Sequence, residues 1–196
     1  GHHALLGSAT FSPDGRYALT AGGDDNTVRL WDVSHPASAP RVLQHGSDVR
    51  ALAALDGGIL ASGCTDHKVY LWDVKSASDK PMSLLEGHTS YVWSLAALPR
   101  GLLASGSWDN TVRVWNVAAR TCVAVLQGHT GWLGALAALP DGRLASGSED
   151  KDIRVWELRP RKEKKCPPLG ASLPTLNLNP ICTYTLYVPT LNNPKP

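Results

Sequence analysis

Long hydrophobic runs and paired cysteines are both missing from this 196-residue sequence. No apolar stretch approaches the ~20 residues that a membrane-spanning helix needs. The four cysteines include no Cys-x-x-Cys pair, and a secreted disulfide-stabilised domain would hold cysteines more densely. We therefore expect reduced thiols in an intracellular protein, cytoplasmic or nuclear, that does not engage a membrane.

Phenylalanine is also nearly absent, with one residue against seven tryptophans and five tyrosines. Hydrophobic residues make up 43% of the chain, but aromatic residues only 7%. A core filled with aromatic rings of every kind would not show this skew. The composition therefore indicates that tryptophan serves particular positions, in a chain long enough to bury a hydrophobic core.

The chain lacks a large excess of charge, since its formal net charge is +2. Residues 1–158 nevertheless contain 13 Lys/Arg and 16 Asp/Glu, a net of −3, whereas residues 159–196 contain 6 and 1, a net of +5. Eight of the 14 prolines lie between 160 and 196, and dense proline blocks ladder hydrogen bonds. We expect a folded part at 1–158 and a basic, then proline-rich tail at 159–196 that is irregular or disordered.

What the sequence does contain is a repeat. Four segments align, and each ends close behind a tryptophan; the spacings between these tryptophans are 41, 43 and 41 residues. The recurring tryptophans are Trp31, Trp72, Trp115 and Trp156. An aspartate lies six residues before each of them, at Asp25, Asp66, Asp109 and Asp150. A period of this length indicates one supersecondary unit repeated along the chain. Since Gly1 falls inside the pattern, we expect this chain to be part of a longer protein.

Each repeat has the pattern of short strands separated by turns. Turn residues recur at the same place, as SPDGR at 12–16, LDGG at 55–58, LPRG at 98–101 and LPDG at 139–142. Three strands are predicted inside each repeat, and a fourth between repeats at 41–44, 81–86 and 122–127. No segment sustains a helical period for more than a turn or two, so the pattern predicts an all-β fold.

On these residues, the chain resembles the WD-repeat β-propeller family, whose units run ~40–45 residues from a Gly-His to a Trp-Asp. Gly-His is present at Gly1-His2, Gly87-His88 and Gly128-His129, but the second unit has a reversed His45-Gly46. Trp-Asp is present at Trp31-Asp32 and Trp72-Asp73, followed later by Trp115-Asn116 and Trp156-Glu157. The resemblance covers residues 1–158 and implies a propeller of four-stranded antiparallel blades.

The number of repeats leaves the ring open to three interpretations. Propellers have between about four and eight blades, so four repeats fit a closed ring, half of an eight-bladed ring, or part of a larger one. An open arc would expose two blade faces and predicts self-association. The fourth unit lacks a strand directly after Leu158, and ICTYTLYV at 181–188 could supply it after a loop.

Serine, histidine and aspartate recur together and superficially resemble a catalytic triad. An enzyme needs one such site rather than one per repeat, so we expect no enzymatic activity. The resemblance implies instead a structural tetrad in each blade, which satisfies the buried tryptophan N–H and the serine hydroxyl. It is complete in the third and fourth units as His88, Ser105, Asp109 and Trp115, and as His129, Ser146, Asp150 and Trp156. The first unit has Ala21 at the serine position, and the second has Ser62 and Asp66 with a displaced His45.

No cofactor or metal site is expected. No histidine stands at zinc-ligand spacing from a cysteine, and no glycine-rich loop joins a strand to a helix as a phosphate site requires.

Three tryptophans are left over once the repeat is accounted for: Trp93, Trp108 and Trp132. In the family, partners bind on one rim, at positions three and five residues after the Gly-His histidine and just before the turn aspartate. All three surplus tryptophans fall on such positions. The partner-binding residues that the resemblance implies are Tyr91, Trp93, Trp108, Trp132, Asp48, Arg50, Asp24 and Glu149. The alternative is that these rings pack on each other or on a further blade.

The sequence therefore predicts a non-enzymatic scaffold or adaptor that binds proteins or peptides through an aromatic rim patch. A receptor for phosphorylated peptides needs clustered arginines, and only Arg50 lies on the predicted rim. Two alternatives stay open: a substrate-recognition module of a ubiquitin-ligase-type assembly, and a structural subunit of an RNA–protein complex that contacts nucleic acid through the basic tail.

Overall fold

A computed structural model describes residues 1–3 and 5–158 of the chain. These residues form four antiparallel β-sheets, each built from strands that are consecutive in sequence. The predictions for the tail, including the strand at 181–188, lie outside the described residues. The all-β prediction is confirmed, since only two single-turn 3₁₀ segments interrupt the strands within that part, η1 (Asp56–Gly58) and η2 (Pro99–Gly101).

Each sheet is one blade, and its strands follow the order of the sequence. The first blade contains β1 (Leu6–Phe11), β2 (Tyr17–Gly22), β3 (Thr27–Asp32) and β4 (Arg41–Gln44). The second contains β5 (Val49–Leu55), β6 (Ile59–Cys64), β7 (Val69–Asp73) and β8 (Ser83–Leu85). The third contains β9 (Val92–Leu98), β10 (Leu102–Ser107), β11 (Val112–Asn116) and β12 (Thr121–Leu126). The fourth contains β13 (Leu133–Ala138), β14 (Leu144–Ser148) and β15 (Ile153–Trp156). The strands predicted between repeats are thus the outermost strands of the first three blades.

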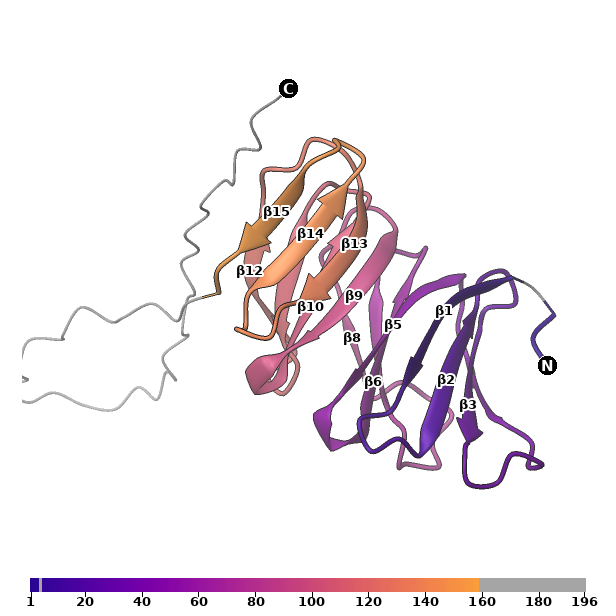
Figure 1. Cartoon of the computed structure of the whole chain (residues 1–196). Helices are drawn as coiled ribbons and strands as arrows, with labels where there is room; N and C mark the ends of the chain where they lie inside the picture. Colours follow the sequence, from indigo (N-terminus) through magenta and orange to yellow (C-terminus); the bar gives the residue numbers. More distant parts are fainter. Residues whose placement is uncertain (4, 159–196) are drawn as a thin grey trace, which may run out of the picture.

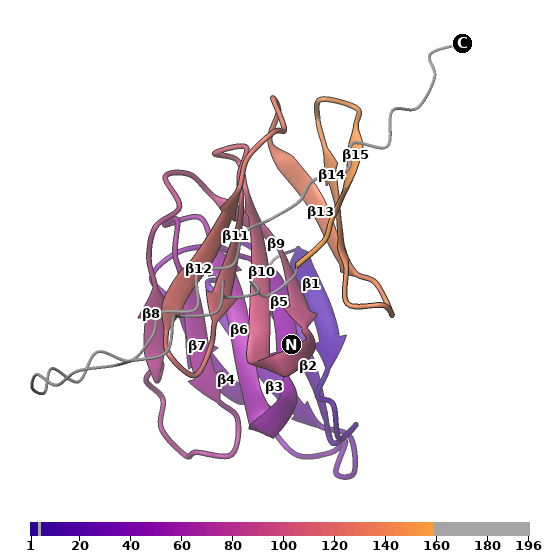
Figure 2. The same ribbon diagram turned by 90° about the vertical axis from the view of Figure 1, so that its left-hand side faces the viewer.

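The blades lie side by side in chain order and form an arc that does not close (Figure 1; Figure 2). The first strands of consecutive blades, β1, β5, β9 and β13, are neighbours along the inner side. The first and fourth blades stand at opposite ends of the arc (Figure 1). Among the residues described, the four repeats therefore build an open portion of a propeller.

Apolar side chains fill the three junctions between blades. Each junction is a separate buried cluster, and the recurring tryptophan of the following blade belongs to it: Trp72, Trp115 and Trp156 are 1–2% exposed. Trp31 has no preceding blade within the described residues and is only partly buried. The recurring tryptophan is therefore a junction residue, which explains its fixed place in the repeat.

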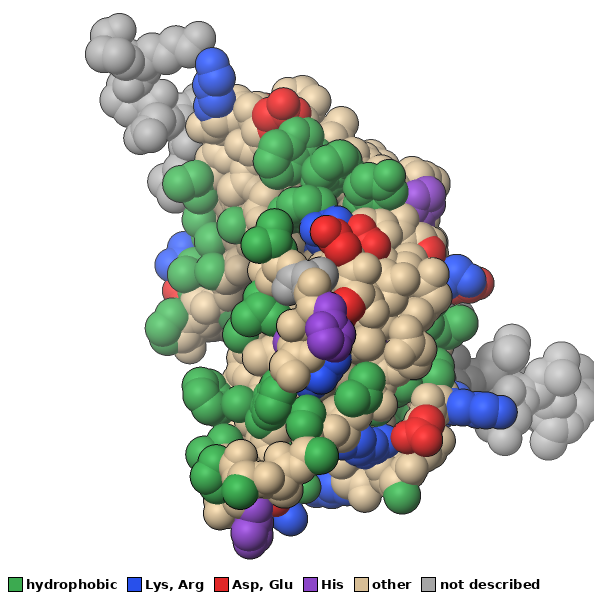
Figure 3. Space-filling model, turned by 90° about the vertical axis from the view of Figure 1, so that its right-hand side faces the viewer, with side chains coloured by type: hydrophobic (Ala, Val, Ile, Leu, Met, Phe, Trp, Pro, Cys, Tyr) green, Lys and Arg blue, Asp and Glu red, His purple; other side chains and the backbone are tan. Residues whose placement is uncertain are grey.

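The two end faces of the arc expose hydrophobic side chains. On the first blade, Leu6 is 57% exposed and Phe11 65%; Figure 3, which looks onto this side, shows hydrophobic side chains over much of the surface. At the other end Ile153 is 72% exposed. The equivalent faces are buried wherever two blades meet, so the end faces have the character of a blade junction.

Candidate functional site

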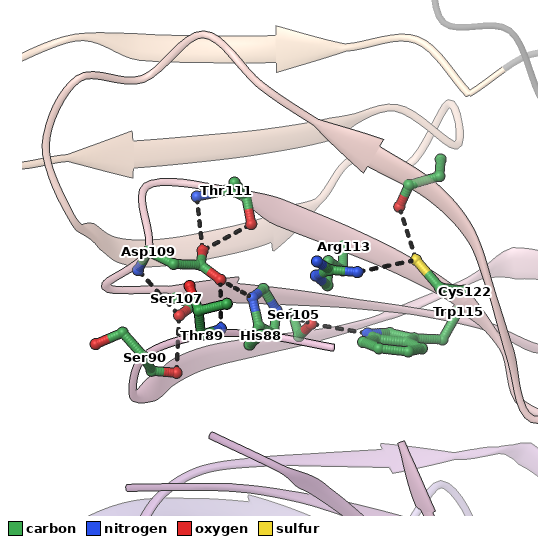
Figure 4. A network of polar contacts seen from close by, with 11 residues as sticks. His88, Thr89, Ser90, Ser105, Ser107, Asp109, Thr111, Arg113, Trp115 and Cys122 are labelled. Atoms are coloured by element: carbon green, nitrogen blue, oxygen red, sulfur yellow. Dashed lines mark hydrogen bonds and ion pairs between the residues drawn. The ribbon is translucent and has the colours of Figure 1, made fainter. Parts of the chain in front are cut away.

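The polar tetrad of the third blade forms as predicted. Trp115 donates its Nε1–H to Ser105 Oγ at 2.8 Å, and the same oxygen bonds His88 Nε2 at 2.7 Å. His88 Nδ1 in turn bonds Asp109 Oδ2 at 2.7 Å (Figure 4). Burial opposes ionisation of Asp109, but hydrogen bonds from His88 and Thr111 outweigh it and hold the pKa of the carboxyl well below its usual range.

The fourth blade repeats this arrangement. Ser146 Oγ bonds Trp156 Nε1 at 2.7 Å and His129 Nε2 at 2.8 Å, and His129 Nδ1 bonds Asp150 Oδ2 at 2.8 Å. Burial again works against the charge of Asp150, yet the hydrogen bonds it accepts lower its pKa to about 2.

The tetrads are not arranged for catalysis. The serine hydroxyls are fully enclosed, with Ser105 0% and Ser146 1% exposed, so no substrate can reach them without the blade opening. Each hydroxyl oxygen is also shared between a tryptophan and a histidine. This geometry satisfies buried polar groups and fixes the turn between two strands.

In the first blade, the prediction that Ala21 occupies the serine position is wrong. Thr20 takes this role: its Oγ1 accepts the Trp31 Nε1–H at 2.8 Å and bonds His2 Nε2 at 2.8 Å. His2 Nδ1 completes the tetrad with Asp25 at 2.7 Å. Counting back ten residues from the tryptophan fails here because the register between β2 and β3 is shifted by one residue: Thr20 faces Arg29, nine residues further along the chain, whereas Ser105 faces Arg113, eight residues further along.

In the second blade, the shortened loop changes the tetrad. His45 still reaches Ser62 Oγ at 2.8 Å, but its Nδ1 bonds the Leu43 carbonyl oxygen at 3.2 Å instead of a carboxylate. Asp66 accepts the Tyr70 hydroxyl at 2.6 Å. Burial lowers the pKa of His45 to about 4, with the Leu43 carbonyl offsetting part of this effect. The displaced histidine that the sequence predicts is confirmed, and its aspartate partner is replaced by a backbone carbonyl.

Four aromatic side chains that the repeat does not explain lie against one another; we call them the rim cluster. Trp108 is at its centre, with ring centroids 4.9 Å from Trp93, 5.1 Å from Tyr91 and 5.5 Å from Trp132. The rings therefore pack on each other, which was one alternative from the sequence. Tyr91 nevertheless remains 38% exposed and Trp108 37%, so the cluster still presents aromatic surface.

A backbone contact explains why residues distant in sequence meet at this rim. In three blades, the residue before the turn aspartate donates its N–H to the carbonyl oxygen of the residue three positions after the histidine or its equivalent. These pairs are Thr65 to Asp48 at 3.1 Å, Trp108 to Tyr91 at 3.0 Å, and Glu149 to Trp132 at 3.0 Å. In the first blade the donor to Leu5 is Gly23, so Asp24, which directly precedes the turn aspartate, does not make this contact.

The predicted charged residues connect to the rim cluster through Arg50. Its guanidinium carbon lies 5.4 Å from the Trp93 ring centroid. Its Nη2 donates to Asp48 at 2.5 Å and to Asp24 at 3.3 Å. All eight residues predicted for the rim are therefore linked by ring, ion-pair or backbone contacts that run across the four blades.

Sequence reasoning missed one aromatic neighbour of this surface. The His67 ring lies 5.9 Å from that of Tyr91, although it belongs to the second blade and follows no rim rule. Its backbone has a positive φ of 71°, as in the turns of the other blades. In each blade the residue directly after the turn aspartate has a positive φ. The position of the turn aspartate could therefore have located His67.

The described residues contain no group of three or more His, Cys, Asp or Glu side chains arranged to hold a metal ion. Within the same part of the chain, none of the helical segments has the length and apolar character that crossing a bilayer requires.

Comparison with known proteins identifies the repeat. The family model described as "WD domain, G-beta repeat" matches residues 1–32, 39–73, 79–116 and 120–157. The structure of U3-55K superimposes with a TM-score of 0.73 and 29% identity, covering 80% of this chain and 50% of that one. The WD40 β-propeller domain of Doa1 gives a TM-score of 0.71 and 26% identity, covering 84% and 53%.

Curated relatives match over shorter stretches. The WD repeat-containing protein RUP1 of Arabidopsis thaliana is 30% identical over 77 residues, which is 37% of this chain and 20% of the relative. The anaphase-promoting complex subunit cdc20 of Dictyostelium discoideum is 35% identical over 85 residues, covering 43% and 16%. The chain thus spans about half of the solved structures and a smaller share of these curated relatives.

Proposed function

The chain belongs to the WD40 family of G-beta repeats, and we propose that it binds proteins or peptides through its rim cluster without chemistry of its own. Proteins built from these repeats act in general as protein-interaction scaffolds, and relatives of this chain occur in multi-subunit assemblies. The fold alone does not select a partner. The more specific proposal therefore depends on the surface that this chain presents.

The observation that carries the proposal is the exposure of Tyr91 and Trp108, at 38% and 37%. A large aromatic side chain buries ~150–250 Å² when fully covered, and binding energy at protein interfaces concentrates in Trp, Tyr and Arg. Trp108 is held by three neighbouring rings, so a partner would meet an already ordered surface and little side-chain entropy would be lost on binding.

The charges around the rim cluster favour a partner with basic side chains. Asp24, Asp48 and Glu149 outnumber Arg50, whose charge is already paired with the two aspartates. A phosphorylated peptide would have to compete with these carboxylates for one guanidinium, which counts against that class. We propose an apolar anchor that covers Trp108, flanked by Lys or Arg.

The two alternative functions from the sequence analysis rank below this proposal. A substrate-recognition role in a ubiquitin-ligase-type assembly would use the same surface and differs in the identity of the partner. An RNA–protein role would require the basic run within 159–165, which lies outside the described residues. The division of the chain at residue 158 likewise stays a prediction.

The test is a binding measurement on fluorescently labelled peptides in which the apolar anchor and the flanking charge are varied. We expect peptides with an aromatic or aliphatic anchor beside Lys or Arg to bind best, and Trp108→Ala to weaken them by about tenfold or more. Phe11→Ala is the matched control, because Phe11 is 65% exposed at the opposite end of its blade. Equal affinity for native protein and a folded Trp108→Ala variant would contradict the proposal.

A further inference from the structure

A pocket lies between the third and fourth blades, at the end opposite to the rim cluster. The turn that joins β9 to β10 forms one wall; the turn that joins β13 to β14 and the residues after β15 form the other (Figure 1). Its volume of about 410 Å³ falls within the ~300–1,000 Å³ typical of ligand pockets. The structure therefore offers a second surface to a ligand, separate from the aromatic rings.

The floor of this pocket is apolar. Leu98 ends β9 and Leu102 begins β10, and the two side chains are 7% and 8% exposed. Leu158 of the fourth blade packs against the same buried cluster, and all three leucines line the pocket. An aliphatic side chain that entered here would leave water for an apolar surface, which favours binding.

The charged side chains of the lining differ in their pairing. Arg143 donates its Nε–H to Asp141 Oδ2 at 2.7 Å. Arg100 is exposed, and its side chain has no hydrogen-bond or ion-pair partner among the described residues. One cation beside the apolar floor is thus available to a ligand.

Arg100 also occupies a turn position that favours glycine. Its φ is 64°, whereas the corresponding residue of the second blade is Gly57, with a φ of 81°. A side chain in this left-handed region costs energy that glycine avoids. Arg120, between β11 and β12, has a φ of 58° but does not line this pocket. The backbone conformation alone therefore does not mark a site; the unpaired cation beside the apolar floor does.

We propose that this pocket binds a short acidic peptide segment, with an aliphatic side chain on the leucine floor and a neighbouring Asp or Glu carboxylate on Arg100. A bond from a guanidinium to a carboxylate is charge-assisted and among the stronger hydrogen bonds. A single carboxylate fits better than a phosphate, because Asp141 and Glu157 in the same lining would repel a doubly charged group more strongly.

This inference goes beyond the proposed function and does not depend on it. Six-residue β10 separates the two sites, since Arg100 precedes this strand and Trp108 follows it. At about 3.3 Å per residue, the strand spans ~20 Å. The rim cluster favours a basic segment and the pocket an acidic one, so the two sites would select partners of opposite charge.

Fluorescence anisotropy of short labelled peptides titrated with the full chain tests the proposal. The reference peptide carries Leu-Glu in a Gly/Ser background, and two relatives replace its Glu by Gln or its Leu by Ala. We expect the reference peptide to bind. Each replacement should weaken binding at least about fivefold, because one removes the charge that Arg100 recognises and the other the side chain that fills the floor.

Substitutions in the protein locate the binding. Arg100→Gly removes the cation at a position whose φ suits glycine, so the turn should be kept and the reference peptide should bind at least about fivefold more weakly. Arg120→Gly is the matched control, with the same change of charge and a similar φ, and should leave the affinity unchanged. Asp141→Asn retains an acceptor for the Arg143 N–H but removes a competing charge, so it should strengthen binding.

Several results would overturn the proposal. Equal losses in Arg100→Gly and Arg120→Gly would reduce the effect to net charge, and equal binding of the Glu and Gln peptides would show that no carboxylate is recognised. Tighter binding when phosphoserine replaces Glu would assign the pocket to phosphopeptides. Absence of binding by the reference peptide, or its loss in Trp108→Ala but not in Arg100→Gly, would exclude the pocket as its site. The rim cluster is tested with basic peptides, so its result stays separate.

Discussion

Arg50 lies with its guanidinium carbon 5.4 Å from the centre of the Trp93 ring while it donates to Asp24 and Asp48. Asp24 belongs to the first blade, Arg50 and Asp48 to the second, and Trp93 to the third. One cation therefore joins the rims of three blades through an aromatic face and two carboxylates.

Replacing Arg50 by methionine should remove this link while keeping most of the apolar side-chain stem. We expect a loss of about 1 kcal/mol in the free energy of unfolding, from the cation–π contact and a partly exposed ion pair. Urea denaturation measures it, with Arg143→Met as the control. Arg143 pairs with Asp141 inside one exposed turn, so its replacement should change stability by less than ~0.5 kcal/mol. Equal losses for both variants would deny Arg50 a bridging role.

Thr20→Val tests the corrected tetrad of the first blade. The substitution preserves shape but removes the oxygen that serves Trp31 and His2. Leaving the Trp31 N–H and the His2 ring nitrogen without a partner should cost about 1–3 kcal/mol. Thermal and urea unfolding would record the loss. The hydroxyl of Ser34, whose bonds to Asp32 and His35 lie at the surface, provides the comparison, and Ser34→Ala should be nearly neutral. A neutral Thr20→Val would mean that the first blade does not depend on its tetrad.

Asp109→Ala and Asp66→Ala should differ, although both aspartates occupy the same place in the repeat. Asp109 accepts hydrogen bonds from His88, Thr89 and Thr111, whereas Asp66 serves Lys68 and Tyr70. We expect a loss of about 2–3 kcal/mol for Asp109→Ala and about 1 kcal/mol for Asp66→Ala. Chemical denaturation of the two variants side by side is the measurement. Similar losses would indicate that the second blade uses its aspartate as the third does.

The stability of the protein should fall between about pH 6.5 and pH 4 because of His45. Burial lowers the pKa of this histidine to about 4 from its ordinary 6.5, so the unfolded state binds more protons than the folded state in this window. Stability from this group is complete above pH 6.5 and declines as the pH falls toward 4. Linkage gives a loss of about 2 kcal/mol at pH 5 relative to pH 7.5.

Urea denaturation at several pH values follows this loss, and His45→Gln should flatten the profile between pH 6.5 and 4.5. The aspartates of the other tetrads act in a lower window. The pKa of Asp25 and that of Asp150 are each lowered to about 2, so their contribution is present above pH 4 and is lost as the pH falls toward 2. If the free energy of unfolding of His45→Gln falls as steeply between pH 6.5 and 4.5 as that of the native protein, another group causes the loss.

The sequence predicts the blades well because each unit repeats the same local solution. The tryptophan spacing and turn residues predict the number and order of the described strands, and the rim rule brings together residues from four separate turns. The role of Thr20 was not predicted because the spacing to the tryptophan counts residues along the chain. The tetrad depends instead on which residues face each other across the sheet. The register between β2 and β3 differs by one residue from that of the equivalent strands in the second and third blades. Register read from Arg29, which faces Thr20 as Arg113 faces Ser105, recovers the correct position.

Contacts between side chains of different blades were the part that the sequence could not specify. Nothing in the repeat indicates that Arg50 of the second blade lies over Trp93 of the third. Such contacts depend on how far each blade rotates against the next, and this angle is set by the packing of whole junctions.

The three separate junction clusters have a consequence for how this part of the chain comes apart. Each blade packs only against its immediate neighbours. The stability of the arc is therefore approximately the sum of the stabilities of the single blades and of the contacts between neighbouring blades. We expect the two middle blades, held on both sides, to outlast the terminal ones during unfolding. The rim contacts from Asp24 to Trp132 cross all three junctions. A partner bound across this surface would therefore make the blades unfold as one cooperative unit.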